Sequence, residues 1–116
     1  MSIKGNVGLN VTNVLTTDTT LIDLSVLPGS PDRIAITAAS LHNTTASPVV
    51  VQVYVSPDLT SASGDEVDYI SVEANSTADI AGIISQGIAT GENIIAKAGV
   101  AGCNAFLTIV EYTGGV

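Results

Sequence analysis

The sequence predicts an all-β protein, an antiparallel β-sandwich of jelly-roll type with seven to eight short strands. Apolar side chains recur at every second position through most of the chain, which is the period of a strand with one buried face. Groups of Pro, Gly, Ser and Asp separate these segments, as in residues 28–32 and 56–66. Composition does not change along the chain, so we expect one domain over residues 15–116, preceded by an arm over residues 1–14.

Three strands are expected in the first half of the chain. Residues 7–14 are the weakest candidate. Residues 20–26 would bury Ile22, Leu24 and Val26 and leave Asp23 and Ser25 outside. Residues 33–43 begin with Ile34, Ile36 and Ala38 on one face, but Leu41 then takes over the buried position. This change of phase predicts a β-bulge near Ala39 and Ser40.

The second half gives four more strands and an ambiguous segment. Residues 49–55 would bury their four odd-numbered valines and turn Gln52 and Tyr54 outward. Residues 67–73 place Ile70 and Val72 inward, and residues 93–98 place Lys97 outward. Residues 105–112 are apolar on both faces, which is typical of a central strand or of one covered by a neighbour. Residues 78–89 could be helical, but Gly82 and Gly87 lower helix propensity, so we expect a short strand and a loop.

The composition favours a protein that lives in an assembly. Hydrophobic residues are 46% of the chain but aromatic ones only 3%, so the core must be aliphatic. Charged residues are 12%, about half of the usual share. A surface of Thr, Ser and Asn is cheap to dehydrate against another protein and poorly solubilises a monomer.

The charge excludes two classes of partner. The net charge is −8, and Lys4, Arg33 and Lys97 are the only cations. Binding to phosphates, in nucleic acid or in anionic lipid, needs clustered cations. The chain also lacks an apolar run of about 20 residues and an N-terminal signal peptide. We therefore expect neither nucleic acid nor a membrane as partner.

Catalytic chemistry has few candidates. A triad of Ser40, His42 and Asp58 can be imagined, but triads are recognised by geometry and a serine-rich chain offers many such combinations. We expect His42 at a strand end, facing solvent or a subunit. The single cysteine, Cys103, is expected to be a buried thiol, so no intrachain disulfide or metal–thiolate cluster can form. We expect no catalytic residue and no cofactor.

A weak calcium candidate lies after the long loop. Asp65, Glu66 and Asp68 are close in sequence, with Asp58 in the same loop. Calcium is bound by carboxylate oxygens, which loops of β-sandwiches can supply. The D-x-D-x-D-G spacing is missing, however, and an acidic loop is usually only solvated. Glycoside hydrolysis is disfavoured, because four aromatic side chains cannot line a sugar cleft.

Five features in chain order resemble a group of small tailed-phage virion proteins. They are T-L-I-D-L at residues 20–24, S-L-H-N-T at residues 40–44, the valine strand that runs from Val49 to Pro57, G-D-E at residues 64–66 and G-I-A-T-G-E-N-I-I-A at residues 87–96. The resemblance covers residues 18–112. Its motifs are mostly turns and strand ends.

The resemblance implies a capsid decoration (cement) protein, made in the host cytoplasm and bound to the outer surface of the phage head. Its partner would be the major capsid protein, and it would self-associate as a homotrimer. The arm would pair with the edge of a partner strand through Ile3, Val7, Leu9 and Val11. The alternative is a tail, neck or head-fibre component that binds a receptor or carbohydrate. An enzyme is the weakest hypothesis.

Overall fold

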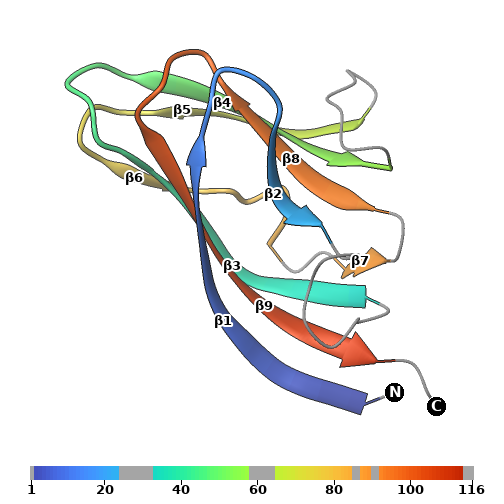
Figure 1. Cartoon of the computed structure of the whole chain (residues 1–116). Coiled ribbons are helices and arrows are strands. Elements are labelled where there is room, and N and C mark those ends of the chain that lie inside the picture. Colours follow the sequence, from blue (N-terminus) through green and yellow to red (C-terminus); the bar gives the residue numbers. More distant parts are fainter. Residues whose placement is uncertain (1, 24–32, 58–64, 85–86, 90–91, 114–116) are drawn as a thin grey trace.

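The computed structural model describes residues 2–23, 33–57, 65–84, 87–89 and 92–113. Within these ranges the chain forms nine strands, all in antiparallel sheets (Figure 1). The strands are β1 (Ser2–Val14), β2 (Thr19–Asp23), β3 (Arg33–Asn43), β4 (Val49–Ser56), β5 (Glu66–Val72), β6 (Thr77–Asp79), β7 (Gly87–Ala89), β8 (Asn93–Ala98) and β9 (Cys103–Thr113). The all-β sandwich predicted from the alternation is confirmed.

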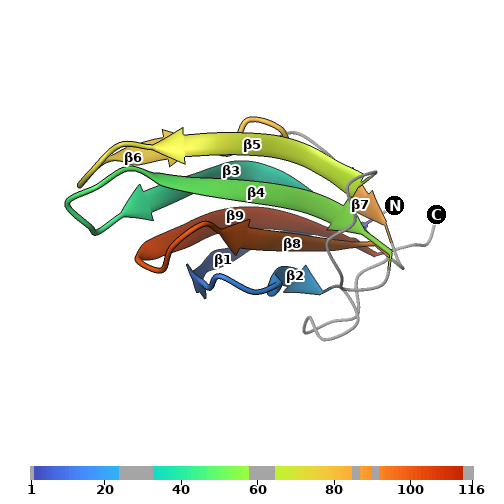
Figure 2. The same ribbon diagram turned by 90° about the horizontal axis from the view of Figure 1, so that it is seen from above.

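The two sheets have the connectivity of a jelly roll. Sheet A runs β1-β9-β3-β6, and β7 pairs with β3 beside β6, while sheet B runs β2-β8-β4-β5. The pairs are nested: β4 lies with β5, β3 with β6 and β7, β2 with β8, and β1 with β9. The chain is thus one long hairpin whose successive pairs alternate between the sheets. Figure 2 shows sheet B overlying sheet A.

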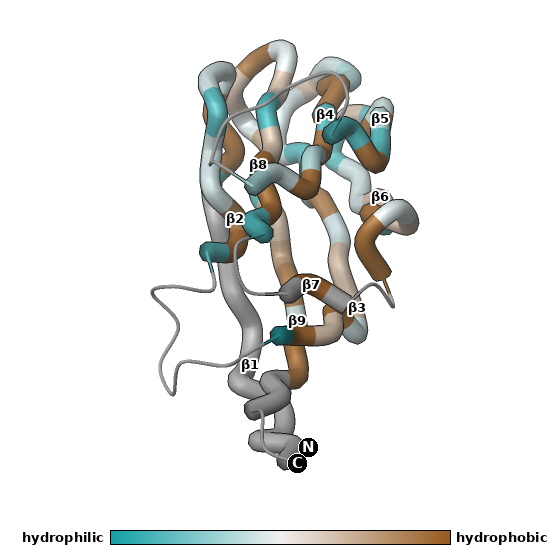
Figure 3. The backbone as a smooth tube through the Cα atoms, turned by 90° about the vertical axis from the view of Figure 1, so that its right-hand side faces the viewer, coloured by the Kyte–Doolittle hydropathy of each residue, from teal (hydrophilic) through white to brown (hydrophobic). Residues whose placement is uncertain are grey.

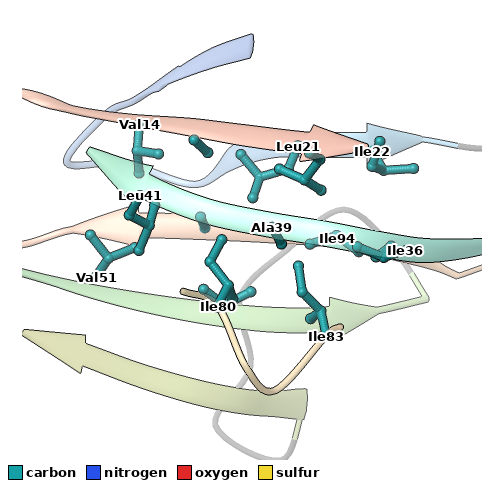
Figure 4. Packing of buried hydrophobic residues seen from close by; sticks show 14 of the residues in the cluster. Val14, Leu21, Ile22, Ile36, Ala39, Leu41, Val51, Ile80, Ile83 and Ile94 are labelled. Atoms are coloured by element: carbon teal, nitrogen blue, oxygen red, sulfur yellow. The ribbon is translucent and has the colours of Figure 1, made fainter. Parts of the chain in front are cut away.

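The core between the sheets is almost entirely aliphatic (Figure 4). Ile34, Ile36 and Leu41 come from β3 and face Val49, Val51 and Val53 of β4, and all six are at most 1% exposed. Polar and apolar residues follow one another along the strands (Figure 3). Burying each such side chain contributes about 1.5–3 kcal/mol. The alternation of the sequence is therefore the main source of the fold's stability.

The segment between β6 and β7 adds two side chains to the core. Ile80 and Ile83 are both fully buried, and Figure 4 shows them pointing in between the sheets. Residues 81–84 form a turn. The prediction of a short strand and a loop in place of a helix is confirmed.

The β-bulge of β3 exists, but it lies earlier than predicted. Ile36 pairs with Ile109 and Ala38 pairs with Thr108, so Thr37 is the extra residue. Its hydroxyl donates to the carbonyl of Thr108 at 3.2 Å. As a result Ala38 is exposed and Ala39 is buried, the reverse of the prediction. Because Ala38 and Ala39 are identical in hydropathy, the pattern of apolar residues cannot show which of them is buried or where the bulge lies.

A second register shift changes the buried face of β2. The shift falls between Thr20 and Ile22, so both Leu21 and Ile22 are buried. The predicted inward position of Ile22 is confirmed. The predicted positions of Leu24 and Val26 lie outside the described residues. The β9 strand lies between β1 and β3, which confirms its prediction as a central strand.

A buried amide closes one end of the sandwich. Asn43 is fully buried at the end of β3, and its Nδ2 donates to the carbonyls of Ser47 at 2.7 Å and Val72 at 3.0 Å. Its Oδ1 accepts the amide and hydroxyl hydrogens of Thr45 at 2.9 and 2.8 Å. Glu73 supplies a further acceptor carbonyl at 3.3 Å. One side chain therefore joins the β3–β4 turn to the end of β5.

A glycine allows the turn of residues 81–84 to lie against β5. A Cβ at Gly82 would stand 2.4 Å from the carbonyl oxygen of Val67, so a side chain there would push the turn away. The amide of Gly82 donates to Oδ2 of Asp68 at 2.8 Å. The turn therefore covers part of the edge of sheet B, and covered edges are less able to pair with other chains.

We predict that Asn43→Asp destabilises the protein by about 3 kcal/mol, because a carboxylate oxygen would replace the donor that faces three carbonyls. Urea denaturation measures the free energy of unfolding. Asn104→Asp is the matched control, since Asn104 is only partly buried, and it should change stability by about 0.5 kcal/mol or less. Equal effects of the two substitutions would contradict the assigned role of Asn43.

The faces of β4 can be tested in the same way. Val51→Asp should prevent folding, because Val51 is fully buried and an unpaired carboxylate there is costly. Gln52→Asp should leave the fold intact, because Gln52 faces outward and is only partly buried. Circular dichroism and thermal unfolding distinguish the two variants. The opposite result would mean that the strand's faces are inverted.

Candidate functional site

A row of outward-facing side chains crosses the outer face of sheet B. Gln52 of β4 pairs with Tyr69 of β5 on one side and with Lys97 of β8 on the other. These three side chains form a row across the sheet because alternation turns all of them away from the core. Tyr69 is 64% exposed. An amphipathic ring on an open sheet face is typical of a contact surface.

A shallow hollow lies over this row. It has a volume of about 490 Å³ and is lined by Thr16, Val50, Gln52, Tyr69, Lys97, Ala98 and Gly99. Two backbone hydrogen bonds join the segments that line it. The amide of Ala98 donates to the carbonyl of Leu15 at 2.9 Å, and the amide of Gly99 donates to the carbonyl of Val50 at 2.8 Å. The hollow is therefore held by strand β4 and by the segments that follow β1 and β8.

Exposed apolar side chains gather around the hollow. Among the residues whose side chains the structure describes (13–23, 33–57, 65–84, 88 and 92–110), three large hydrophobic side chains are exposed: Leu15 at 47%, Tyr69 at 64% and Val100 at 53%. Tyr69 lines the hollow, Leu15 precedes its Thr16, and Val100 follows its Gly99. We call the hollow with Leu15 and Val100 the Tyr69 patch. Contiguous exposed apolar surface of this kind marks a site of interaction.

The other half of the same face is closed. Tyr54, predicted to face outward, does alternate with the inward valines but is only 4% exposed. Ile95, its partner on β8, is fully buried. Burial raises the pKa of the Tyr54 phenol above its ordinary value, and the carboxylates of Glu66 and Asp18 raise it further. The solvent-exposed part of the outer face of sheet B is therefore the half that contains Tyr69.

The acidic residues proposed to bind calcium lie at the start of β5. Glu66 and Asp68 belong to the strand, and Asp65 immediately precedes it. Both carboxylate oxygens of Asp68 accept backbone amides, from Tyr69 at 2.9 Å and Gly82 at 2.8 Å. Among the described residues, no three His, Cys, Asp or Glu side chains are grouped as a metal site would require. Calcium binding stays a prediction. Asp68 also has a structural role, because its carboxylate accepts these two backbone amides.

The residues considered for catalysis lie on the outer face of sheet A. Ser40 and His42 are both on β3 and both partly buried. Nδ1 of His42 is 3.0 Å from the hydroxyl of Thr77 on β6. Asp58 lies outside the described residues. The side chain of His42 therefore takes part in the contact between strands β3 and β6.

Cys103 is a fully buried thiol at the start of β9, as predicted. Burial raises its pKa, so the reactive thiolate is disfavoured. The described residues also contain no helix long and apolar enough to cross a membrane.

The residues predicted to bind a partner belong to β1, which pairs with β9. Leu9 pairs with Thr108, Val11 with Phe106 and Ile3 with Tyr112. Val7 falls in a register shift between Asn6 and Leu9. The residues expected to form an arm thus make the outermost strand of sheet A. Pairing of this strand with another protein stays a prediction.

We predict a pH dependence for Tyr54. Its pKa in the folded protein lies above the ordinary value of 10.0, so above pH 10 the unfolded chain releases this proton while the folded chain keeps it. The free energy of unfolding must then fall as pH rises from 10 toward the raised pKa. Tyr54→Phe should remove this part of the pH dependence, measured by denaturation at several pH values. Tyr69→Phe is the control; an unchanged slope in Tyr54→Phe would refute the assignment.

No model of a known protein family matches the sequence, and no curated protein matches it. A solved structure of Bacillus endospore appendages, which form "a novel family of disulfide-linked pili", is similar over 95% of this chain and 86% of that chain. The two chains are 17% identical, and the TM-score is 0.49. At this identity the likeness concerns the fold alone.

This finding corrects the function expected from the sequence, since the similar structure is a bacterial pilus protein and not a phage virion protein. The predicted role as a phage capsid decoration protein is wrong, and so is the alternative of a tail, neck or head-fibre component. One of the motifs behind that resemblance has a structural explanation. Asn43 of S-L-H-N-T is the buried amide that closes the sandwich. This motif therefore serves the fold and carries no information about the partner.

Proposed function

We propose that this chain is a structural subunit that associates with further copies of itself. The observation that carries the proposal is the Tyr69 patch, where the exposed Tyr69 lines one hollow and the exposed Leu15 and Val100 adjoin its lining residues in the chain. Association would remove this apolar surface from water, at about 25 cal/mol for each Å². Tyr is also enriched at the centres of protein interfaces.

The surroundings of the patch suit a protein partner. Gln52 and Thr16 beside Tyr69 are neutral and can exchange hydrogen bonds with water for hydrogen bonds with a neighbour at little cost. The single charge in the patch is that of Lys97. A chain of net charge −8 can approach another copy most easily where carboxylates are missing, and the patch is such a place.

The proposal accounts for the chemistry of the rest of the molecule. Two of the titratable side chains singled out from the sequence serve the fold: Asp68 accepts two backbone amides and His42 contacts Thr77. The patch has side chains suited to binding another protein and not to a chemical reaction. We therefore propose a role without catalysis, in which the sandwich is a rigid building unit.

Sedimentation velocity over a range of protein concentrations tests the proposal. We expect concentration-dependent self-association of the wild-type chain. Tyr69→Glu should lower the association constant at least tenfold, or about 1.4 kcal/mol, because a carboxylate would replace the exposed ring in an acidic chain. A wild-type chain that stays monomeric at its highest soluble concentration would refute the proposal.

Ala81→Glu is the matched control. It adds the same charge at an exposed position in the turn of residues 81–84, outside the residues that make up the patch. We expect its association constant to equal that of the wild-type chain. Equal weakening by both variants would show that net charge alone governs association.

A further inference from the structure

A second surface without carboxylates lies on the opposite side of the sandwich. The outward positions of β3 and β9 in sheet A carry Ala35, Ala38, Ser40, Phe106, Thr108 and Val110, which we call the strip. Ala38 pairs with Thr108 and Ser40 with Phe106, so these side chains lie side by side across two central strands. All six are partly buried or exposed.

The strip and the Tyr69 patch are complementary in shape and composition. Ala38, Ser40 and Thr108 are small and form a low area beside the larger Phe106, whereas Tyr69 projects from sheet B with 64% of its surface exposed. Both surfaces are without carboxylates, which matters in a chain with 11 acidic residues. A protruding ring against small side chains gives close packing without desolvated charge.

One pair of charges beside the two surfaces is of opposite sign, although the exposed Arg33 also lies at the far end of the strip, next to Ala35. Lys97 lies within the patch, and the exposed Asp79 of β6 borders the strip through its pairing with Ser40. A patch set on a strip brings these charges toward each other. A patch set on a second patch would bring two copies of Lys97 together, which costs free energy.

We propose that the Tyr69 patch of one copy binds the strip of the next, so that self-association is head to tail. This inference rests on the proposed function and specifies the contact through which it operates. Because the two surfaces lie on opposite faces of one sandwich, each copy can bind two neighbours. Such heterologous contacts give an open chain when the rotation between copies does not close a ring. Opposite faces favour the open chain over the homotrimer expected from the sequence.

Mixing two variants tests the contact. Ala38→Glu places a carboxylate on the strip and leaves the patch intact, whereas Tyr69→Glu does the reverse. Each variant alone should lose self-association at least tenfold. An equimolar mixture should recover a one-to-one dimer, because the patch of the first variant still fits the strip of the second. Sedimentation velocity of the separate and mixed samples reads out the result, with Ala81→Glu as control and circular dichroism to confirm folding.

Each outcome decides the inference. Recovery of the dimer on mixing supports it. Normal association of Ala38→Glu alone overturns it while leaving the proposed function in place, since copies would still assemble through another surface. Loss of association in both variants without recovery on mixing overturns it as well. If Ala38→Glu does not fold, Thr108→Glu on the neighbouring strand replaces it. A wild-type chain without any self-association refutes the proposed function itself.

Discussion

Burial of every second aliphatic side chain between two sheets is the constraint on which the other features depend. Once Val49, Val51 and Val53 face the core, Val50 and Gln52 must face outward. The pairing of β4 with β5 and β8 then places Tyr69 and Lys97 beside Gln52. The composition of the patch therefore follows from the packing of the core, and a register slip of one residue in β5 would bury Tyr69.

The buried amide of Asn43 complements this apolar packing. Aliphatic side chains cannot satisfy the backbone groups where strands end, and unsatisfied buried polar groups are costly. Asn43 binds the carbonyl of Val72, the last residue of β5, and so fixes the end of the strand that carries Tyr69. The bulge at Thr37 has a comparable role in sheet A, because it turns Ala38 outward and Ala39 inward. Both surfaces in the proposed contact thus depend on local polar or irregular features.

The sequence predicted the sandwich, most strand positions and most buried faces because a period of two is a direct consequence of strand geometry. It placed the bulge wrongly because Ala38 and Ala39 are chemically identical. It assigned Tyr54 to the correct face of the strand but did not predict that this side chain is buried. Alternation determines which face a side chain points to, and it does not tell whether other residues cover that face. The patch could not be predicted either: Thr16, Tyr69 and Gly99 are far apart in sequence and line the same hollow only because of strand pairing. The functional expectation failed because motifs such as S-L-H-N-T encode turns.

The contrast between the two halves of the outer face of sheet B explains why association would be specific. In one half the apolar side chains of Tyr54 and Ile95 are already buried, so a neighbouring copy would remove no further apolar surface from water there. The open half keeps Tyr69 and the aliphatic part of Lys97, where a partner can remove apolar surface from water. Net negative charge keeps other regions of two copies apart. Attraction confined to small surfaces without carboxylates, with repulsion elsewhere, selects one orientation for each added copy, and a regular assembly needs that selection more than it needs high affinity.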